Sequence, residues 1–324
     1  MSREIKRILV IKLGALGDFV LALAAARRIR EAHPKAHITL LTTLPFEALA
    51  RSSPYFNEVW TNGRPALFGE WWALVLQLRH ARFDRVYDLQ TSSRSSLLRL
   101  MLGPFPPQWS GIAFGASHRH RNPRRDHMHT LERQADQLRV AGIWPDAPTE
   151  VGSAPPPDLS WILKKYRAPA PVAGAPPPKP YALLVPGASE KRPEKRWPAE
   201  RFGELAGRLR EAGFDVVIIG GPQESALART IQKSNSQARD LTGRTDFAQI
   251  AVLGARAALA VGNDTGPLHL IAAAGAPTVA LFSSASDPAL CGPRGHVAVL
   301  QAENLGDMEV DMVLRTAMSA AKPR

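Results

Sequence analysis

Residues 261–270 read Val-Gly-Asn-Asp-Thr-Gly-Pro-Leu-His-Leu, and this segment constrains the fold more than any other stretch of the chain. The apolar run 251–261 ends here like a short buried strand, and residues 268–274 are small, apolar and compatible with a helix. We therefore expect a strand-to-helix turn over 263–267, with Pro267 suited to the first helical turn. Such a turn directs free backbone N–H groups toward a phosphate or diphosphate, although an ordinary capped helix after a strand would look the same.

The same order of strand, glycine-containing turn and helix recurs in both halves of the chain. In the first half, a buried strand is followed by a glycine-rich turn at 12–18 and a helix at 19–32. Two Rossmann-like α/β domains that face each other across a cleft are the predicted fold. The principal predicted strands are 7–11, 37–42, 83–89, 181–185, 215–219, 257–261 and 278–282.

A proline-rich stretch at 154–180 marks the clearest change in composition. Proline runs at 155–157 and 176–178 flank a short polar helix that we expect at 159–166. Proline-rich sequence disfavours sheet and helix interiors and serves as a semi-rigid spacer. We therefore predict a first domain over 1–167, a linker over 168–180 and a second domain over 181–324.

The charge of the chain favours an anionic partner. There are 41 basic and 29 acidic residues, a formal net charge of +12, which fits a nucleic acid, an anionic membrane surface or a phosphorylated substrate. A single cysteine, Cys291, excludes an intramolecular disulfide and a cysteine-based zinc site. No apolar run reaches the roughly 18–20 residues of a membrane span, and no signal peptide is apparent, so we expect a cytoplasmic protein.

The glycine-rich turn of the first half does not match a dinucleotide fingerprint. Gly14 and Gly17 form the pattern G-x-x-G-D instead of G-x-G-x-x-G, and the second strand does not end on an acidic residue. We therefore exclude an NAD site. Asp18 follows directly, at the carboxyl edge of the first strand, where it could act as a general base or simply cap the helix.

In the second half, the residues after successive strands should collect at one sheet edge. These are Ser189, Lys195, Glu224 and the turn at 263–266. Lys195 and the helix N-terminus at Gly266 could together neutralise a diphosphate, although Lys195 could equally be a solvated loop residue. Because no Asp-x-Asp pair is present, we expect no metal and no other cofactor.

Residues 117–129 carry four arginines and four histidines. They could form a solvated basic loop or a loop that binds phosphate or carboxylate through arginine. A metal cluster is disfavoured because crowded arginines repel a cation, and nucleic acid is disfavoured because no aromatic residue is interleaved.

Three motifs taken together resemble glycosyltransferase family 9, the bacterial heptosyltransferases of lipopolysaccharide core assembly. They are residues 8–18, residues 186–189 with 195–198, and residues 262–270 with 275–282. The resemblance implies a GT-B fold and an inverting, metal-independent transfer of heptose from ADP-heptose to an anionic lipopolysaccharide inner-core acceptor. It also leaves peripheral contact with the cytoplasmic face of the inner membrane open.

The resemblance also assigns residues to roles. It implies that Asp18 is the catalytic aspartate and that Lys195 binds the diphosphate. The donor-binding residues would be Ser189, Glu224, Thr242, Asp264, Thr265, Gly266 and His269. The first domain would take the acceptor, through Arg119, Arg121, Arg124, Arg125 and His129.

Two alternatives remain open from the sequence. One is an enzyme of the same family with another sugar donor or a non-lipopolysaccharide acceptor, because residues 19–25 read Phe-Val-Leu-Ala-Leu-Ala-Ala where many members have proline or histidine. The other is a non-catalytic nucleotide-sugar-binding protein.

Overall fold

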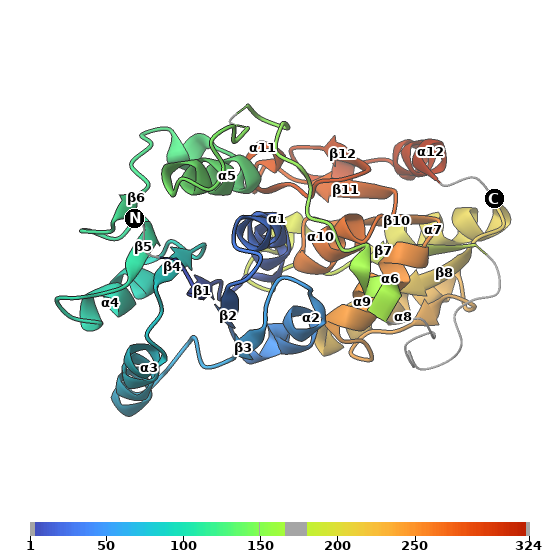
Figure 1. Cartoon of the computed structure of the whole chain (residues 1–324). Coiled ribbons are helices and arrows are strands. Elements are labelled where there is room, and N and C mark those ends of the chain that lie inside the picture. Colours follow the sequence, from blue (N-terminus) through green and yellow to red (C-terminus); the bar gives the residue numbers. More distant parts are fainter. Residues whose placement is uncertain (1–3, 149, 166–179, 322–324) are drawn as a thin grey trace. The chain divides into compact units, whose positions relative to one another are not determined.

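The computed structural model describes residues 4–148, 150–165 and 180–321 (Figure 1). The chain divides into two compact units, Met1–Pro156 and Pro157–Arg324. This division falls before the predicted limit at residue 167, because helix α6 (Trp161–Lys165) packs against α9 (Phe247–Arg256) of the second unit. The predicted linker over 168–180 lies outside the described residues except for Pro180.

The first unit contains a six-stranded parallel sheet in the order β3-β2-β1-β4-β5-β6 (Figure 1). The central strand β1 is fully buried over residues 8–11, which explains its continuous apolar sequence. The strands are β1 (Arg7–Ile11), β2 (His37–Leu41), β3 (Glu58–Trp60), β4 (Arg85–Asp88), β5 (Gln108–Gly111) and β6 (His118–Arg119).

The helices of the first unit connect these strands, and α1 packs against α5. Helix α1 begins at Leu16, three residues earlier than predicted. Gly14 has a φ of +116°, a conformation that glycine adopts readily, and Ala15 takes the N-cap position, where its carbonyl accepts from Phe19 N at 2.8 Å. The helices are α1 (Leu16–Ala32), η1 (Leu44–Phe46), α2 (Glu47–Ser52), α3 (Phe68–Ala81), α4 (Ser93–Met101), η2 (Arg125–His127) and α5 (Thr130–Val140).

The second unit contains another six-stranded parallel sheet, in the order β12-β11-β10-β7-β8-β9. Strand β10 extends to Asn263, two residues beyond the predicted end, so only Asp264 and Thr265 separate it from helix α10. The strands are β7 (Tyr181–Val185), β8 (Asp215–Ile218), β9 (Arg239–Asp240), β10 (Leu259–Asn263), β11 (Thr278–Phe282) and β12 (Val297–Gln301).

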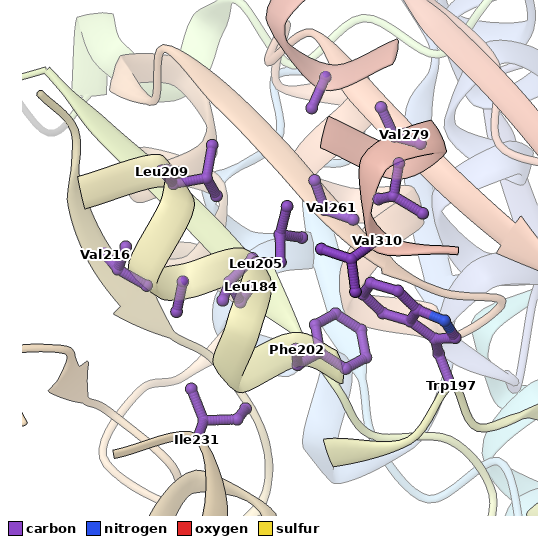
Figure 2. Close-up of a cluster of buried hydrophobic side chains, with 14 of the residues drawn as sticks. Leu184, Trp197, Phe202, Leu205, Leu209, Val216, Ile231, Val261, Val279 and Val310 are labelled. Atoms are coloured by element: carbon purple, nitrogen blue, oxygen red, sulfur yellow. The ribbon is translucent and has the colours of Figure 1, made fainter. Parts of the chain in front are cut away.

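A large apolar cluster joins this sheet to its helices (Figure 2). Trp197 and Phe202 pack edge to face with ring centroids 4.9 Å apart, and the Trp197 indole N–H donates to the Met308 carbonyl at 3.0 Å. This contact fixes the loop before α7 against the start of the last helix. The helices are η3 (Pro193–Lys195), α7 (Ala199–Glu211), η4 (Pro222–Glu224), α8 (Ser225–Ser234), α9, α10 (Gly266–Ala273), α11 (Pro288–Cys291), η5 (Leu305–Asp307) and α12 (Val310–Ala320).

Candidate functional site

The predicted donor-binding residues gather at the carboxyl edge of the second sheet. Strands β10, β7, β8 and β9 are neighbours and run parallel, so the turns that follow them share one edge. This is the edge at which open α/β sheets bind ligands. The sequence therefore predicted correctly that residues far apart in the chain would converge here.

An ion pair lies at the centre of this edge. Lys195 Nζ lies 2.6 Å from Asp264 Oδ2, and the Ser286 hydroxyl donates to the same oxygen at 2.8 Å. His269 Nε2 lies 3.8 Å from Asp264 Oδ1. Burial alone would raise the pKa of Asp264, but the nearby His269 and the hydrogen bonds from Lys195 and Ser286 outweigh it and hold this pKa well below the usual range. Asp264 is therefore a carboxylate throughout the physiological pH range.

This pairing changes the expected role of Lys195. The sequence suggested a free cation or a solvated loop lysine, but the Lys195 side chain is only 14% exposed and Asp264 only 8%. A diphosphate at this edge would have to share the Lys195 ammonium with Asp264. The fixed carboxylate would then orient the lysine and offset its positive charge.

The N-terminus of α10 lies directly after this carboxylate. Thr265 is the N-cap, with φ −150° and ψ 156°, and its side chain makes no capping hydrogen bond. Pro267 has no N–H, and the Leu268 and His269 N–H groups donate to the Thr265 carbonyl at 3.1 and 3.4 Å, so the Gly266 N–H is the group at this helix start that is suited to an anion. His269 is one turn further on, and its Nδ1 atom is buried without a hydrogen-bond partner among the residues that the structure describes.

Asn263 is a site residue that the sequence analysis did not single out. Its side chain is fully buried, its Nδ2 donates to the Pro186 carbonyl at 2.8 Å, and its Oδ1 accepts from Trp197 N at 3.0 Å. One amide thus joins the turn after β7, the loop that carries Lys195, and the turn that carries Asp264. The sequence signal that could have indicated Asn263 was its position as a polar residue between an apolar strand and a charged turn.

Glu224 lies in the same edge, after β8. Its carboxylate accepts from the Gly221 backbone N–H, and burial raises its pKa despite this bond. A Cβ atom at Gly187 would lie 2.7–2.8 Å from the Glu224 side chain, and one at Gly220 would lie 2.9 Å from its Cβ. Both positions therefore require glycine to admit Glu224.

Thr242 and Ser189 differ in burial. Thr242 is buried, and its hydroxyl donates to Asp240 Oδ1 at 2.7 Å and lies 3.2 Å from the Ser225 hydroxyl. Ser189 is exposed, and its carbonyl accepts from Arg192 N at 3.0 Å. Thr242 is therefore a buried part of the carboxyl edge of the sheet, whereas the Ser189 hydroxyl is at the surface.

Asp18 lies in the first turn of α1, at the carboxyl edge of the first sheet. Ala15 occupies the N-cap, so the alternative that Asp18 caps the helix is wrong. The Asp18 side chain is half-buried, at the helix end where the dipole favours a negative charge. Gly14 lies in the turn before α1, where a Cβ would lie 3.0 Å from the Phe46 ring, whereas Gly17, predicted in this turn, is the second residue of the helix.

Two buried charged residues lie beneath this turn. Lys12 is 5% exposed and donates to the Leu89 carbonyl at 3.4 Å, and Asp88, at the end of β4, is fully buried. Burial lowers the pKa of Lys12, while the negative charges of Asp18 and Asp88 oppose that shift. Burial raises the pKa of Asp88 to about 6, against hydrogen bonds from the backbone N–H groups of Thr91 and Gln90. Sequence reasoning missed this pair, although Lys12 directly follows an apolar strand.

The basic segment 117–129 is only partly a solvated loop. His120 and Asp136 are buried, with His120 Nε2 2.8 Å from Asp136 Oδ2. His129 is also buried, caps α5 by accepting from Leu131 N at 3.1 Å, and lies 3.2 Å from Glu132. His129 therefore fixes the start of α5, and the structure gives no basis for its predicted contact with an acceptor.

The arginines of this segment differ in accessibility. Arg121 and Arg124 are exposed, and Arg119 lies over the Phe114 ring at 5.7 Å. Arg125 turns inward and donates to the Thr91 hydroxyl at 2.6 Å, beside Asp88. Arg121 and Arg124 are thus free to meet an anionic acceptor, whereas Arg125 borders the carboxyl edge of the first sheet.

Within the described residues, no group of three or more histidine, cysteine, aspartate or glutamate side chains is placed to hold a metal ion. The prediction that transfer needs no metal stays a prediction.

Solved structures resemble this fold along almost its whole length. The structure of Escherichia coli ADP-heptose lipopolysaccharide heptosyltransferase II has a TM-score of 0.79 at 26% identity, covering 96% of this chain and 97% of that one. A family 9 glycosyltransferase from Veillonella parvula has a TM-score of 0.80 at 21% identity, covering 99% and 98%. With the two six-stranded parallel sheets, these matches confirm the predicted α/β GT-B fold.

Sequence comparison gives the family. Lipopolysaccharide heptosyltransferase 2 of Escherichia coli strain K12 is 27% identical over 315 residues, covering 90% of this chain and 86% of that protein. Lipopolysaccharide heptosyltransferase 1 of Pseudomonas aeruginosa is 27% identical over 313 residues, covering 90% and 82%. Residues 71–309 match the family described as glycosyltransferase family 9 (heptosyltransferase). The chain thus belongs to glycosyltransferase family 9, the heptosyltransferases, and is a glycosyltransferase.

Proposed function

We propose that this enzyme transfers heptose from ADP-heptose to an inner-core acceptor of lipopolysaccharide, in the cytoplasm, with inversion at the anomeric carbon and without a metal ion. The names of its relatives, among them lipopolysaccharide heptosyltransferases 1 and 2, support this donor and acceptor class. A related structure at 21% identity is described with ADP-2-deoxy-2-fluoro heptose. The observation that carries the proposal is the Lys195–Asp264 pair beside the uncapped N-terminus of α10.

The second unit would hold the donor. The β-phosphate would accept from the Gly266 N–H and from Lys195, which is held by Asp264, itself held by the Ser286 hydroxyl. Glu224, in the glycine-lined turn after β8, would accept from hydroxyl groups of the nucleoside, and Thr242 would border the adenine. His269 Nδ1, which has no hydrogen-bond partner among the described residues, would form a further hydrogen bond with the sugar diphosphate.

Asp18 of the first unit would act as the general base. As the acceptor hydroxyl attacks the anomeric carbon, its proton passes to the Asp18 carboxylate. The new carbon–oxygen bond forms on the face opposite the departing ADP, so the configuration inverts. The bond from the anomeric carbon to the phosphate oxygen breaks, and Lys195 with the α10 dipole stabilises the charge that develops on ADP. This mechanism requires Asp18 to reach the donor held by the second unit.

The function is tested by ADP release from a panel of nucleotide sugars in the presence of deacylated core acceptors. We expect ADP-heptose to be the preferred donor. Asp18→Asn should lower kcat by at least about 10²-fold with little change in donor affinity, as expected for loss of a general base. Unchanged turnover in this variant would remove Asp18 from the mechanism, and preference for another nucleotide sugar would favour the alternative of a different donor.

The metal-free mechanism is tested separately. Turnover of the wild-type enzyme should persist in an excess of chelator, because Lys195 and the α10 N-terminus carry the leaving-group charge in place of a cation. Complete loss of turnover, with recovery on adding Mg²⁺ or Mn²⁺, would contradict this part of the proposal.

A further inference from the structure

One surface of the first unit combines exposed apolar side chains with arginines. On α3, Phe68, Trp72 and Leu76 are four residues apart and share one helix face, with 80%, 46% and 48% of their surface exposed. On α4, Leu97 and Leu100 are 45% and 71% exposed. We call the following residues the α3–α4 surface: Phe68, Trp72, Leu76, Leu97, Leu100, Phe105 and Phe114.

Arginine contacts hold α3 and α4 together at both ends. Near their N-termini, Arg94 of α4 donates to the Pro65 carbonyl at 3.1 Å and lies 5.2 Å from the Trp71 ring centroid. Near their C-termini, Arg79 of α3 donates to the Met101 carbonyl at 2.9 Å. The two helices, both labelled in Figure 1, therefore form one continuous face.

The two phenylalanines outside the helices adjoin the same face. Phe105 is 95% exposed and lines, with Arg79 and Leu102, a hollow of about 520 Å³. Phe114 is 86% exposed, and its carbonyl accepts from Arg99 of α4 at 2.7 Å. The most exposed aromatic side chains of the described chain thus lie on or beside α3 and α4.

The second unit has no comparable surface within its described residues. Its exposed large apolar side chains are Val299, Met312 and Met318, at 42%, 45% and 37%. Singly exposed apolar residues of this kind are normal, whereas a group of strongly exposed aromatic and aliphatic residues marks an interaction surface.

Arginines predominate along the helices of the α3–α4 surface, while Glu4 and Asp84 line the hollow beside Phe105 together with Arg79 and Arg82. Arg79, Arg94 and Arg99 border this surface, and α4 contains no acidic residue. The single carboxylate of α3, Glu70, accepts from the backbone N–H groups of Ala66 and Leu67 at the helix start. A second copy of this face would bring arginines against arginines, so symmetric self-association is electrostatically unfavourable.

We propose that the α3–α4 surface docks the enzyme onto an anionic lipid bilayer. The aromatic and leucine side chains would enter the interfacial layer, and the arginine guanidiniums would meet lipid phosphates. Within the described residues, no helix is both long and apolar enough to cross a bilayer. This inference deepens the proposed function, since a lipid-linked acceptor lies at a membrane surface, but its test needs neither donor nor acceptor.

The test is flotation of the full chain with vesicles of phosphatidylcholine alone and of phosphatidylcholine with phosphatidylglycerol. We expect binding to the anionic vesicles only, weakened by added salt. The triple variant Phe68→Ser, Leu100→Ser, Phe105→Ser should bind at least about tenfold more weakly, because it removes three side chains that are 71–95% exposed. The matched control is Val151→Ser, Met312→Ser, Met318→Ser, which removes exposed apolar residues elsewhere and should bind like the wild type.

Three outcomes would overturn the proposal. The first is that the wild type does not bind vesicles, and the second is that both triple variants lose binding equally. The third is that the wild type dimerises without binding vesicles, and that the Phe68, Leu100 and Phe105 variant alone abolishes this dimerisation. Thermal unfolding and ADP release with a deacylated acceptor, measured without vesicles, show whether the variant is folded. That second assay also tests the proposed reaction independently, so failure of one proposal is distinguishable from failure of the other.

Discussion

At the scale of single residues, this protein depends on buried polar side chains that hold charged ones in place. Asp264 fixes Lys195, Asn263 fixes the segments that carry both, and the pair Lys12 and Asp88 lies under the turn of Asp18. Buried polar groups of this kind must be hydrogen-bonded to be tolerated, and they then rigidify their surroundings.

Replacement of Asn263 tests whether it positions Lys195. Asn263→Ala leaves the Pro186 carbonyl and Trp197 N without this partner, which should cost about 2–3 kcal/mol of unfolding free energy. Because the Lys195 loop would loosen, we also expect kcat/KM for the donor to fall about tenfold or more. Steady-state kinetics and urea unfolding measure the two effects.

Asn235→Ala is the matched control for this substitution. Asn235 is also buried in the second unit, where its Nδ2 donates to the Ala206 carbonyl at 3.1 Å, away from the donor edge. It should lose stability but keep the kinetic constants of the wild type. Equal kinetic losses in both variants would show that Asn263 has only a structural role.

Asp88 should make stability depend on pH. Its pKa is about 6 in the folded chain against an ordinary value of 3.8, so the folded state binds the proton more tightly and stability falls as pH rises between these values. From pH 5 to pH 7 the expected contribution is a loss of about 1 kcal/mol. In Asp88→Asn, the contribution of Asp88 to the difference in unfolding free energy between pH 5 and pH 7 should disappear. Urea unfolding at the two pH values measures this difference. An unaltered difference between pH 5 and pH 7 would contradict the raised pKa.

At the scale of elements, the ends of strands and helices decide the chemistry. Helix α1 starts early enough to carry Asp18 in its first turn, and α10 starts late enough to leave Asp264 outside it. The basic segment 117–129 is fixed because His120 and His129 bind carboxylates of α5.

The role of His129 in anchoring α5 is testable. His129→Ala removes the N-cap bond to Leu131 N and the buried contact with Glu132, so it should lower the unfolding free energy by about 2 kcal/mol. His127→Ala, at an exposed position of the same segment, should change it by less than about 0.5 kcal/mol. Urea unfolding of both variants measures the difference. Equal stability of the two would refute the capping role.

At the scale of the whole molecule, the two units divide the work that we propose. The second unit would bind the nucleotide through Lys195 and the α10 N-terminus, and the first would supply Asp18, the acceptor arginines and the membrane surface. Donor binding should therefore be separable from catalysis by substitutions in different units.

This separation predicts how ADP affects thermal unfolding. At about 100 times its Kd, ADP should stabilise the wild type by about 2.7 kcal/mol, and Asp18→Asn should show the same stabilisation. Lys195→Ala should lose most of it at equal ADP concentration, because the phosphate loses a cation. Differential scanning calorimetry across an ADP titration provides the measurement. Loss of the ADP effect in Asp18→Asn would argue against the proposed division.

The sequence alone predicted the principal strands and the family, but it missed the strands β3, β5, β6 and β12. Strands such as 7–11 and 181–185 were predicted to the residue, because a strand buried on both faces must be apolar throughout. The glycine turns and their order in the chain are sufficient to indicate glycosyltransferase family 9. The convergence of Lys195, Glu224 and 263–266 at one edge also followed from parallel strand order.

Only the tertiary structure decided the partners of each charge. A sequence pattern is local, whereas Lys195 and Asp264 are 69 positions apart and Lys12 and Leu89 are 77 apart. For the same reason the sequence predicted a solvated or anion-binding loop at 117–129 and an acceptor contact for His129, whereas folding buries His120 and His129 against carboxylates of α5. The α3–α4 surface likewise exists only because packing leaves those side chains outside the core, since burial is a property of the fold and not of the residue.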